Sequence, residues 1–260
     1  MGTQPQMHPH ACRESPAPPS YLLPLLQLSD SALPTGAFSH SFGLEVYLAR
    51  GVVHDENSFA AWLRQFIGQQ LVYSDGLAIR LTDEALGGAG SSGAGARCTG
   101  LDSPRFEEVW ELDRQVTAQA LPLQLRGAGI KMGLRMLEIG MGIFPSAALD
   151  AYQEQIKSGR CTGNAGVAFA LTAHGLRIPL SQMLAAYFFS TATTLTQNAV
   201  RAIPLGQSAG QRVLRLIHDD VTAAAATVMT LEAGDLGAVA PGLEIAQMRH
   251  EYQRARMFMS

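Results

Sequence analysis

The stretch LSQMLAAYFFSTATTLTQNAVRAIPLG, residues 180–206, decides the fold class. Its apolar residues recur every three or four positions, which is the spacing of one face of an α-helix. Pro204 and Gly206 mark the end of the run, because proline cannot continue a helix and glycine favours its termination. The pattern predicts a long helix that crosses the core. The members of the run are Leu180, Met183, Leu184, Tyr187, Phe188, Thr191 and Leu195.

Two other stretches repeat this spacing. Ser103 and Pro104 supply an N-cap and a first-turn proline for one of them, which continues with Phe106, Val109 and Trp110. In the other, Asn57 is positioned to cap a helix whose apolar face consists of Phe59, Trp62, Leu63, Phe66, Ile67 and Leu71.

Alternating strand patterns are absent from the sequence, and β-branched residues are sparse beside alanine and leucine. We therefore expect an all-α fold, a single-domain helical bundle of about ten helices over residues 21–240. A chain of 260 residues with 47% apolar residues is long and apolar enough to bury one large core.

Charge and cysteine content narrow the function classes. Nineteen Lys and Arg against 22 Asp and Glu give a net charge of −3, which disfavours nucleic acid as the partner. The three cysteines are widely spaced, which favours a reducing compartment over a disulfide framework. The sequence shows neither a secretory signal nor a run of about 18 apolar residues that could span a membrane. We expect a cytoplasmic protein that binds neither nucleic acid nor membrane.

Three segments differ from the helical pattern. Residues 1–20 carry five prolines among polar residues and are predicted to form a disordered tail. Residues 87–100 are rich in glycine and serine and are predicted to be a flexible insertion. Residues 241–260 combine arginine with Tyr, Phe and Met, the residue types enriched at interfaces. We expect this last segment to bind a partner and to be mobile in the free protein, because ordering a tail costs conformational entropy.

The sequence context argues against two nucleotide-binding motifs. The spacing of Gly88, Gly90 and Gly93 matches a dinucleotide fingerprint, but the residues before it favour a helix where that motif requires a strand. A phosphate-binding loop is excluded, because Lys131 and Lys157 are the only lysines and both follow isoleucine. No cofactor is expected.

Two catalytic or metal-binding alternatives stay open. Gly206, Ser208 and Gly210 have the spacing of a nucleophile elbow, so a helical hydrolase that uses Ser208 is one alternative, although the sheet of such enzymes is not predicted. His8, His10 and Cys12 are weak candidates for metal ligands, which makes a nickel-binding carrier the other. No other histidine has the spacing of a metal site.

A second stretch, LSDSALPTGAFSHSFGLE at residues 28–45, has the specificity of a family signature. It predicts a helix end at residues 29–31, a turn at Pro34 and Gly36, and a new helix from Ser39 or His40. The stretch resembles the signature of the urease accessory protein UreF family. Residues 198–212, NAVRAIPLGQSAGQR, and residues 243–251, LEIAQMRHE, are similar to two further blocks of that family in the same order.

The resemblance implies a non-enzymatic, dimerising helical scaffold. Such a scaffold binds the accessory protein UreD, called UreH in some organisms, and recruits the GTPase UreG, so that nickel is inserted into apo-urease. Asp30, Ser39 and His40 could be helix caps or partner contacts, and the sequence leaves both readings open. The partner-binding residues expected on this resemblance are Asp30, Phe38, Ser39, His40, Glu45, Arg201, Gln207, Gln211, Arg212, Met248, Arg249, His250, Glu251, Tyr252, Arg256 and Phe258.

Overall fold

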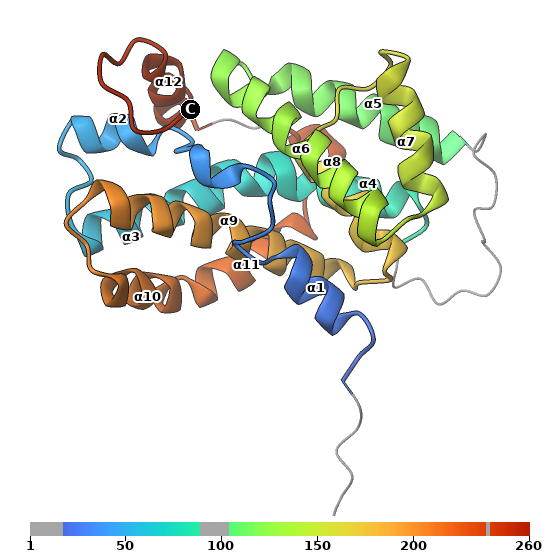
Figure 1. Cartoon of the computed structure of the whole chain (residues 1–260), viewed down its shortest axis with the longest axis horizontal. Helices are drawn as coiled ribbons and strands as arrows, with labels where there is room; N and C mark the ends of the chain where they lie inside the picture. Colours follow the sequence, from blue (N-terminus) through green and yellow to red (C-terminus); the bar gives the residue numbers. More distant parts are fainter. Residues whose placement is uncertain (1–17, 89–103, 238–239) are drawn as a thin grey trace, which may run out of the picture.

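The computed structural model describes residues 18–88, 104–237 and 240–260, and these ranges contain helices and no strand (Figure 1). The prediction of an all-α fold is therefore confirmed. Most of the predicted N-terminal tail and of the glycine-rich insertion lies outside the described residues, as do Ser103 and the candidate metal ligands His8, His10 and Cys12. In the described ranges, no helix is long and apolar enough to cross a membrane.

The helices have the following bounds. The α-helices are α1 (Leu22–Leu28), α2 (Leu44–Ala49), α3 (Glu56–Gln65), α4 (Leu77–Ala85), α5 (Pro104–Gln119), α6 (Leu123–Ile143), α7 (Ala147–Lys157), α8 (Ala165–Gly175), α9 (Leu180–Ala202), α10 (Gln207–Leu216), α11 (His218–Val228) and α12 (Pro241–His250). Two 3₁₀ turns, η1 (Ala37–Ser39) and η3 (Ala233–Asp235), and one π-helix, η2 (Phe66–Gly76), complete the set.

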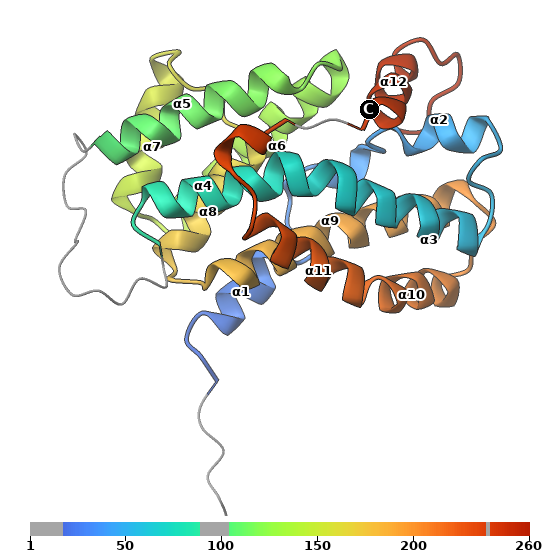
Figure 2. The same cartoon turned by 180° about the vertical axis from the view of Figure 1, so that it is seen from behind.

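Helices α3, η2 and α4 follow one another without a break and form a rod along the long axis of the molecule (Figure 2). Helix α9 packs against η2 and α4 of this rod, and α8 packs against α4, α6 and α7. Helices α5, α6 and α7 gather at one end, whereas α2, α10 and α12 lie at the other (Figure 1).

The structure confirms the long helix predicted from residue 180 onward and corrects two predicted helix starts, those of α3 and α2. Helix α9 begins at Leu180 as predicted, and Met183, Leu184, Phe188 and Leu195 are fully buried. Asn57, however, does not cap α3.

Asp55 is the cap instead: its Oδ1 accepts from the Ser58 backbone N–H at 2.8 Å, and the Ser58 Oγ accepts from the Asp55 N–H at 3.0 Å. This reciprocal capping box satisfies two of the free N–H groups of the first turn, which Asn57 inside the helix could not do. The second correction concerns the helix predicted to start at Ser39 or His40: the short turn η1 ends at Ser39, and α2 starts only at Leu44. Phe42 and Gly43 adopt left-handed φ values of 52° and 89°, which stop a right-handed helix there.

A buried carboxylate joins three elements at the end of the core that holds α5 and α7. Asp113 of α5 is fully buried and accepts hydrogen bonds from the Tyr152 hydroxyl of α7 at 2.5 Å and the Thr162 N–H at 2.6 Å. It also accepts from the Thr162 hydroxyl at 2.8 Å and from the N–H groups of Asn164 at 2.8 Å and Gly163 at 3.2 Å. The Asp113 carboxylate therefore fixes the turn from which α8 starts.

Helix α8 begins at this turn and is buried from Ala165 to Ala173. Its N-cap Asn164 accepts from the N–H groups of Gly166 at 2.9 Å and Val167 at 3.3 Å. Gly133 of α6 lies against the same turn, and a Cβ atom added there would stand 2.0 Å from the Gly163 carbonyl oxygen. Only glycine permits this approach of α6 to α8.

We predict that Gly133→Ala destabilises the protein by about 2 kcal/mol or more, because overpacking of this kind typically costs 1–3 kcal/mol. Gly127→Ala on the same helix is the matched control, since an added Cβ there meets no atom within 4 Å. Alanine is the better helix former, so this control is expected to gain about 0.5–1 kcal/mol. Urea unfolding followed by circular dichroism measures both, and equal free energies of unfolding for the two variants would contradict the close approach.

Candidate functional site

The signature stretch at residues 28–45 and residues 251–260 meet in the folded chain, although they lie more than 200 positions apart. We call residues 251–260 the strap. The Met259 N–H donates to the Ser39 carbonyl at 2.8 Å, and the Ser41 hydroxyl donates to the Ser260 carbonyl at 2.6 Å. His40 is buried, and its Nδ1 lies 2.8 Å from the Ser260 Oγ. The strap thus covers the signature loop.

Glu45 is the centre of this contact. Its carboxylate accepts from the Met257 N–H at 2.5 Å and the Phe258 N–H at 3.2 Å. The Nε2 of His250, which is fully buried, lies 2.8 Å from the same carboxylate, and its Nδ1 lies 2.8 Å from Gln124 Oε1. One buried acid therefore links α2, α12 and the strap.

The sequence predicts a segment that is mobile in the free protein, and the structure of the single chain packs this segment against residues 39–45. Phe258 is 5% exposed and lies under the Arg201 guanidinium, 5.4 Å from ring centroid to Cζ. Burial of an aromatic side chain and charge-assisted hydrogen bonds to Glu45 offset the entropy lost on ordering. His40, Glu45, His250 and Phe258 are occupied by contacts within the chain.

The other predicted residues of this region are exposed or make local bonds. Asp30 accepts from the Ala32 N–H at 2.8 Å, and the Ser39 hydroxyl donates to the Gly36 carbonyl at 2.7 Å, so both stabilise the loop locally. Phe38 is 62% exposed and Tyr252 is 82% exposed. Met248, Arg249, Glu251 and Arg256 are also exposed.

Gln207, Gln211 and Arg212 form a separate group on the exposed surface of α10. Arg212 makes a bidentate ion pair with Glu56 of α3, at 2.6 and 2.9 Å, and its hydrogen bond lowers the pKa of the Glu56 carboxyl. Ser208 is exposed in the first turn of α10, and the described histidines contact residues other than Ser208. Nothing in the described ranges arranges Ser208 as a nucleophile with a histidine base. In the same ranges no three His, Cys, Asp or Glu side chains are grouped to hold a metal ion.

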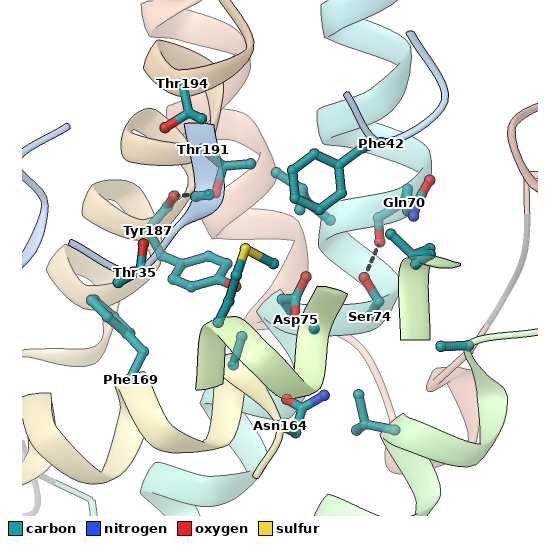
Figure 3. A pocket seen from close by; sticks show the side chains of 18 of the residues that line it. Thr35, Phe42, Gln70, Ser74, Asp75, Asn164, Phe169, Tyr187, Thr191 and Thr194 are labelled. Carbon is teal, nitrogen blue, oxygen red and sulfur yellow. Dashed lines mark hydrogen bonds between the residues drawn. The ribbon is translucent and has the colours of Figure 1, made fainter. Parts of the chain in front are cut away.

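A cavity of about 190 Å³ lies beside the signature stretch (Figure 3). Its wall includes Thr35 and Phe42 from the signature stretch, Gln70, Ser74 and Asp75 from η2, Asn164 and Phe169 at α8, Tyr187, Thr191 and Thr194 from α9, and Gln247 from α12. The cavity is therefore built from two of the sequence blocks that carry the resemblance, residues 28–45 and 243–251, together with η2 and parts of α5, α6, α8 and α9.

Asp75 is one of the ionisable groups that line this cavity, and in Figure 3 it lies between Tyr187 and Ser74. Asp75 is half-buried and lines the cavity. Burial raises the pKa of the Asp75 carboxyl to about 6, against the smaller lowering effect of a hydrogen bond from the Tyr187 hydroxyl. Burial and the nearby Asp75 charge in turn raise the pKa of Tyr187 well above its ordinary value.

Two backbone features place Asp75 there. Asp75 lies in η2, the middle part of the rod, which is a π-helix from Phe66 to Gly76. Such π-helical segments are rare and occur frequently at functional sites. A Cβ atom on Gly166 would stand 3.3 Å from Asp75 Oδ1, so the carboxylate lies beside the first turn of α8, where the helix dipole favours negative charge. Asp75 was not among the site residues predicted from the sequence. The available signal was one acid inside the apolar run LVYSDGLAI at residues 71–79.

The fold and this site define an all-helical protein without a recognisable catalytic constellation in its described part, with a loop and strap surface next to a largely apolar cavity that contains Asp75. The description of the family model that matches residues 53–218 is UreF. The chain is 55% identical to the urease accessory protein UreF of Arthrobacter sp. (strain FB24), over 93% of this chain and 98% of that protein. It is 52% identical to the urease accessory protein UreF of Paenarthrobacter aurescens (strain TC1), over 93% of this chain and 99% of that protein. The chain belongs to the UreF family of urease accessory proteins.

We predict that Glu45→Ala releases the strap. A hydrogen bond to a charged group contributes about 1.5–3 kcal/mol, so losing this acceptor should raise the population of the open strap at least about tenfold. Trypsin cleavage after Arg254 and Arg256, followed by mass spectrometry, is expected to accelerate by that factor while helical content is kept. Glu138→Ala is the control, because Glu138 is exposed and pairs only with its helix neighbour Arg135. Equal cleavage rates in the two variants would show that Glu45 does not hold the strap.

A second prediction concerns the cost of the Asp75 charge. Because the folded-state pKa of about 6 lies above the ordinary value of 3.8, this group stabilises the fold below pH 4, and that contribution is lost as the pH rises through 6. Asp75→Asn should therefore gain stability relative to the native chain between pH 4 and 7.5, by on the order of 3 kcal/mol. Urea unfolding across this pH range measures the difference. Asp150→Asn, on the exposed surface of α7, should show a much smaller change, and a flat difference for Asp75→Asn would refute the burial of its charge.

Proposed function

We propose that this chain is a non-enzymatic scaffold of urease maturation that binds UreD, called UreH in some organisms, and recruits the GTPase UreG for nickel insertion into apo-urease. Membership of the UreF family is the observation that carries this proposal. The absence of a P-loop from the sequence supports it, because the nucleotide chemistry then belongs to a partner. The chain acts in the cytoplasm, as a homodimer, and needs no cofactor of its own.

The surface assigned to UreD is the outer side of the strap and of the signature loop. The side chains that point away from the chain here are large and apolar: Tyr252 is 82% exposed, Phe38 62%, Met259 57% and Met257 55%. Aromatic residues and methionine are enriched at the centres of interfaces, where a few of them supply most of the binding energy. Arg249, Arg254 and Arg256 add charge around this surface.

The buried predicted residues act indirectly in this proposal. Glu45, His250 and Phe258 hold the strap in place, so a partner meets a preformed surface and loses less entropy on binding. The segment from residue 241 onward stays the partner-binding part of the chain, and residues 21–240 form the helical domain that carries it. Gln207, Gln211 and Arg212 lie on α10 and are assigned to a second contact, with UreG or with a second copy of the chain.

The test is co-elution of the full chain with UreD and UreG from the same source on a sizing column with light scattering. The native chain is expected to elute with both partners. Tyr252→Ser and Met259→Ser are each expected to weaken UreD binding at least about tenfold without loss of stability, because both side chains are exposed. Met229→Ser is the matched control, since Met229 is 46% exposed at the end of α11, outside the strap.

Two outcomes would refute the proposal. One is failure of the folded native chain to bind either partner. The other is GTP turnover by the purified chain after all UreG has been removed, because a scaffold leaves that reaction to the GTPase.

A further inference from the structure

The cavity beside Asp75 presents hydroxyl groups whose hydrogens are already donated to other residues. The Ser74 hydroxyl donates to the Gln70 carbonyl at 2.8 Å, and the Thr191 hydroxyl donates to the Tyr187 carbonyl at 2.9 Å (Figure 3). Each of these hydroxyl oxygens keeps lone pairs that can only accept.

A second acceptor lies in the same wall without a partner. Gln247 is 4% exposed, and its Nε2 donates to Gln70 Oε1 at 2.7 Å and to the Phe42 carbonyl at 3.2 Å. Its Oε1 is buried and has no hydrogen-bond partner among the described residues. A buried acceptor left without a donor costs about 1–3 kcal/mol, so a ligand that donates to it would recover that energy.

Among the described residues, no ion pair neutralises the charge of Asp75. Burial and hydrogen bonds account for the perturbation of its carboxyl group, and no described cation contributes to it. Arg126 also lines the cavity, but no ion pair joins it to Asp75 in the described ranges. An uncompensated buried carboxylate is best satisfied by a cation that also donates hydrogen bonds.

Apolar side chains form much of the remaining wall and limit the size of the ligand. Phe42, Phe66, Leu71, Met132, Met136 and Phe169 line it. A cavity of about 150 Å³ is large enough for benzene, so the 190 Å³ here suits one ring with a short chain or an alkyl chain of similar size. Methionine beside aromatic rings also adapts well to varied apolar groups.

We propose that this cavity binds a primary ammonium group carried on an apolar stem, with the nitrogen at Asp75 and the stem against the aromatic and methionine side chains. The same chemistry is offered by a free small amine and by the lysine side chain of a bound protein. A divalent metal ion fits less well, because Asp30, Asp75 and Glu244 in the wall are not grouped to hold a metal ion, and no described histidine or cysteine lines the cavity.

Titration calorimetry on the full chain alone, at pH 8, tests the site independently of urease partners. The probes are phenethylammonium for a free amine, N-acetyl-lysine N-methylamide for a protein side chain, and phenethyl alcohol as the uncharged match of the first. At least one ammonium probe is expected to bind, and the alcohol is expected to bind at least tenfold more weakly than phenethylammonium. The relative affinity of the two ammonium probes tells which source the cavity prefers.

Asp75→Asn keeps the shape of the side chain and is expected to fold, as circular dichroism would verify. It should weaken ammonium binding at least tenfold, whereas Asp150→Asn should leave it unchanged. The proposal is overturned if neither ammonium probe binds, if the alcohol binds as tightly as the amine, or if Asp75→Asn binds as the native chain does. It is also overturned if Ni²⁺ alone binds in an Asp75-dependent manner while both amines fail.

Discussion

The buried carboxylate of Asp113 is the interaction on which the arrangement of the helices depends. It accepts five hydrogen bonds, from Tyr152 on α7 and from three consecutive residues of the turn before α8. Replacing one partner would leave buried N–H groups unsatisfied, which costs more than the bond itself contributes. Because this turn sets where α8 starts, it also sets the approach to Gly133 and the position of the helix end beside Asp75. The core and the cavity therefore share one anchor.

The strap shows a second use of a buried acid. Glu45 gathers backbone N–H groups of the strap and the imidazole of His250, so a short segment without regular structure obtains hydrogen bonds that a helix would otherwise supply. The exposed side chains of the strap, Tyr252, Met257 and Met259, are large and mostly apolar. The same residues thus order the segment on one side and present an interface on the other.

Asp75 differs from these two acids, because its surroundings disfavour the ionised form that the carboxyl group adopts in water. Asp113 and Glu45 are surrounded by donors, whereas burial dominates at Asp75 and raises its pKa to about 6. Natural proteins keep a destabilising buried charge mostly at functional sites. Its position on a π-helix, next to a cavity and an unsatisfied amide oxygen, makes Asp75 the group on which a binding role of this cavity rests.

The sequence by itself determined the helices and the family. Helical periodicity is a property of neighbouring residues, so the run from Leu180 to Leu195, the stop at Pro204 and the absence of strand patterns were enough to predict an all-α fold. Tertiary structure alone decided the rest. Whether His250 meets Glu45, or Asp113 meets Asn164, depends on how segments 50 to 200 residues apart are brought together. The π-helical turn and the cavity at Asp75 likewise arise from packing among distant helices, which local preferences do not encode.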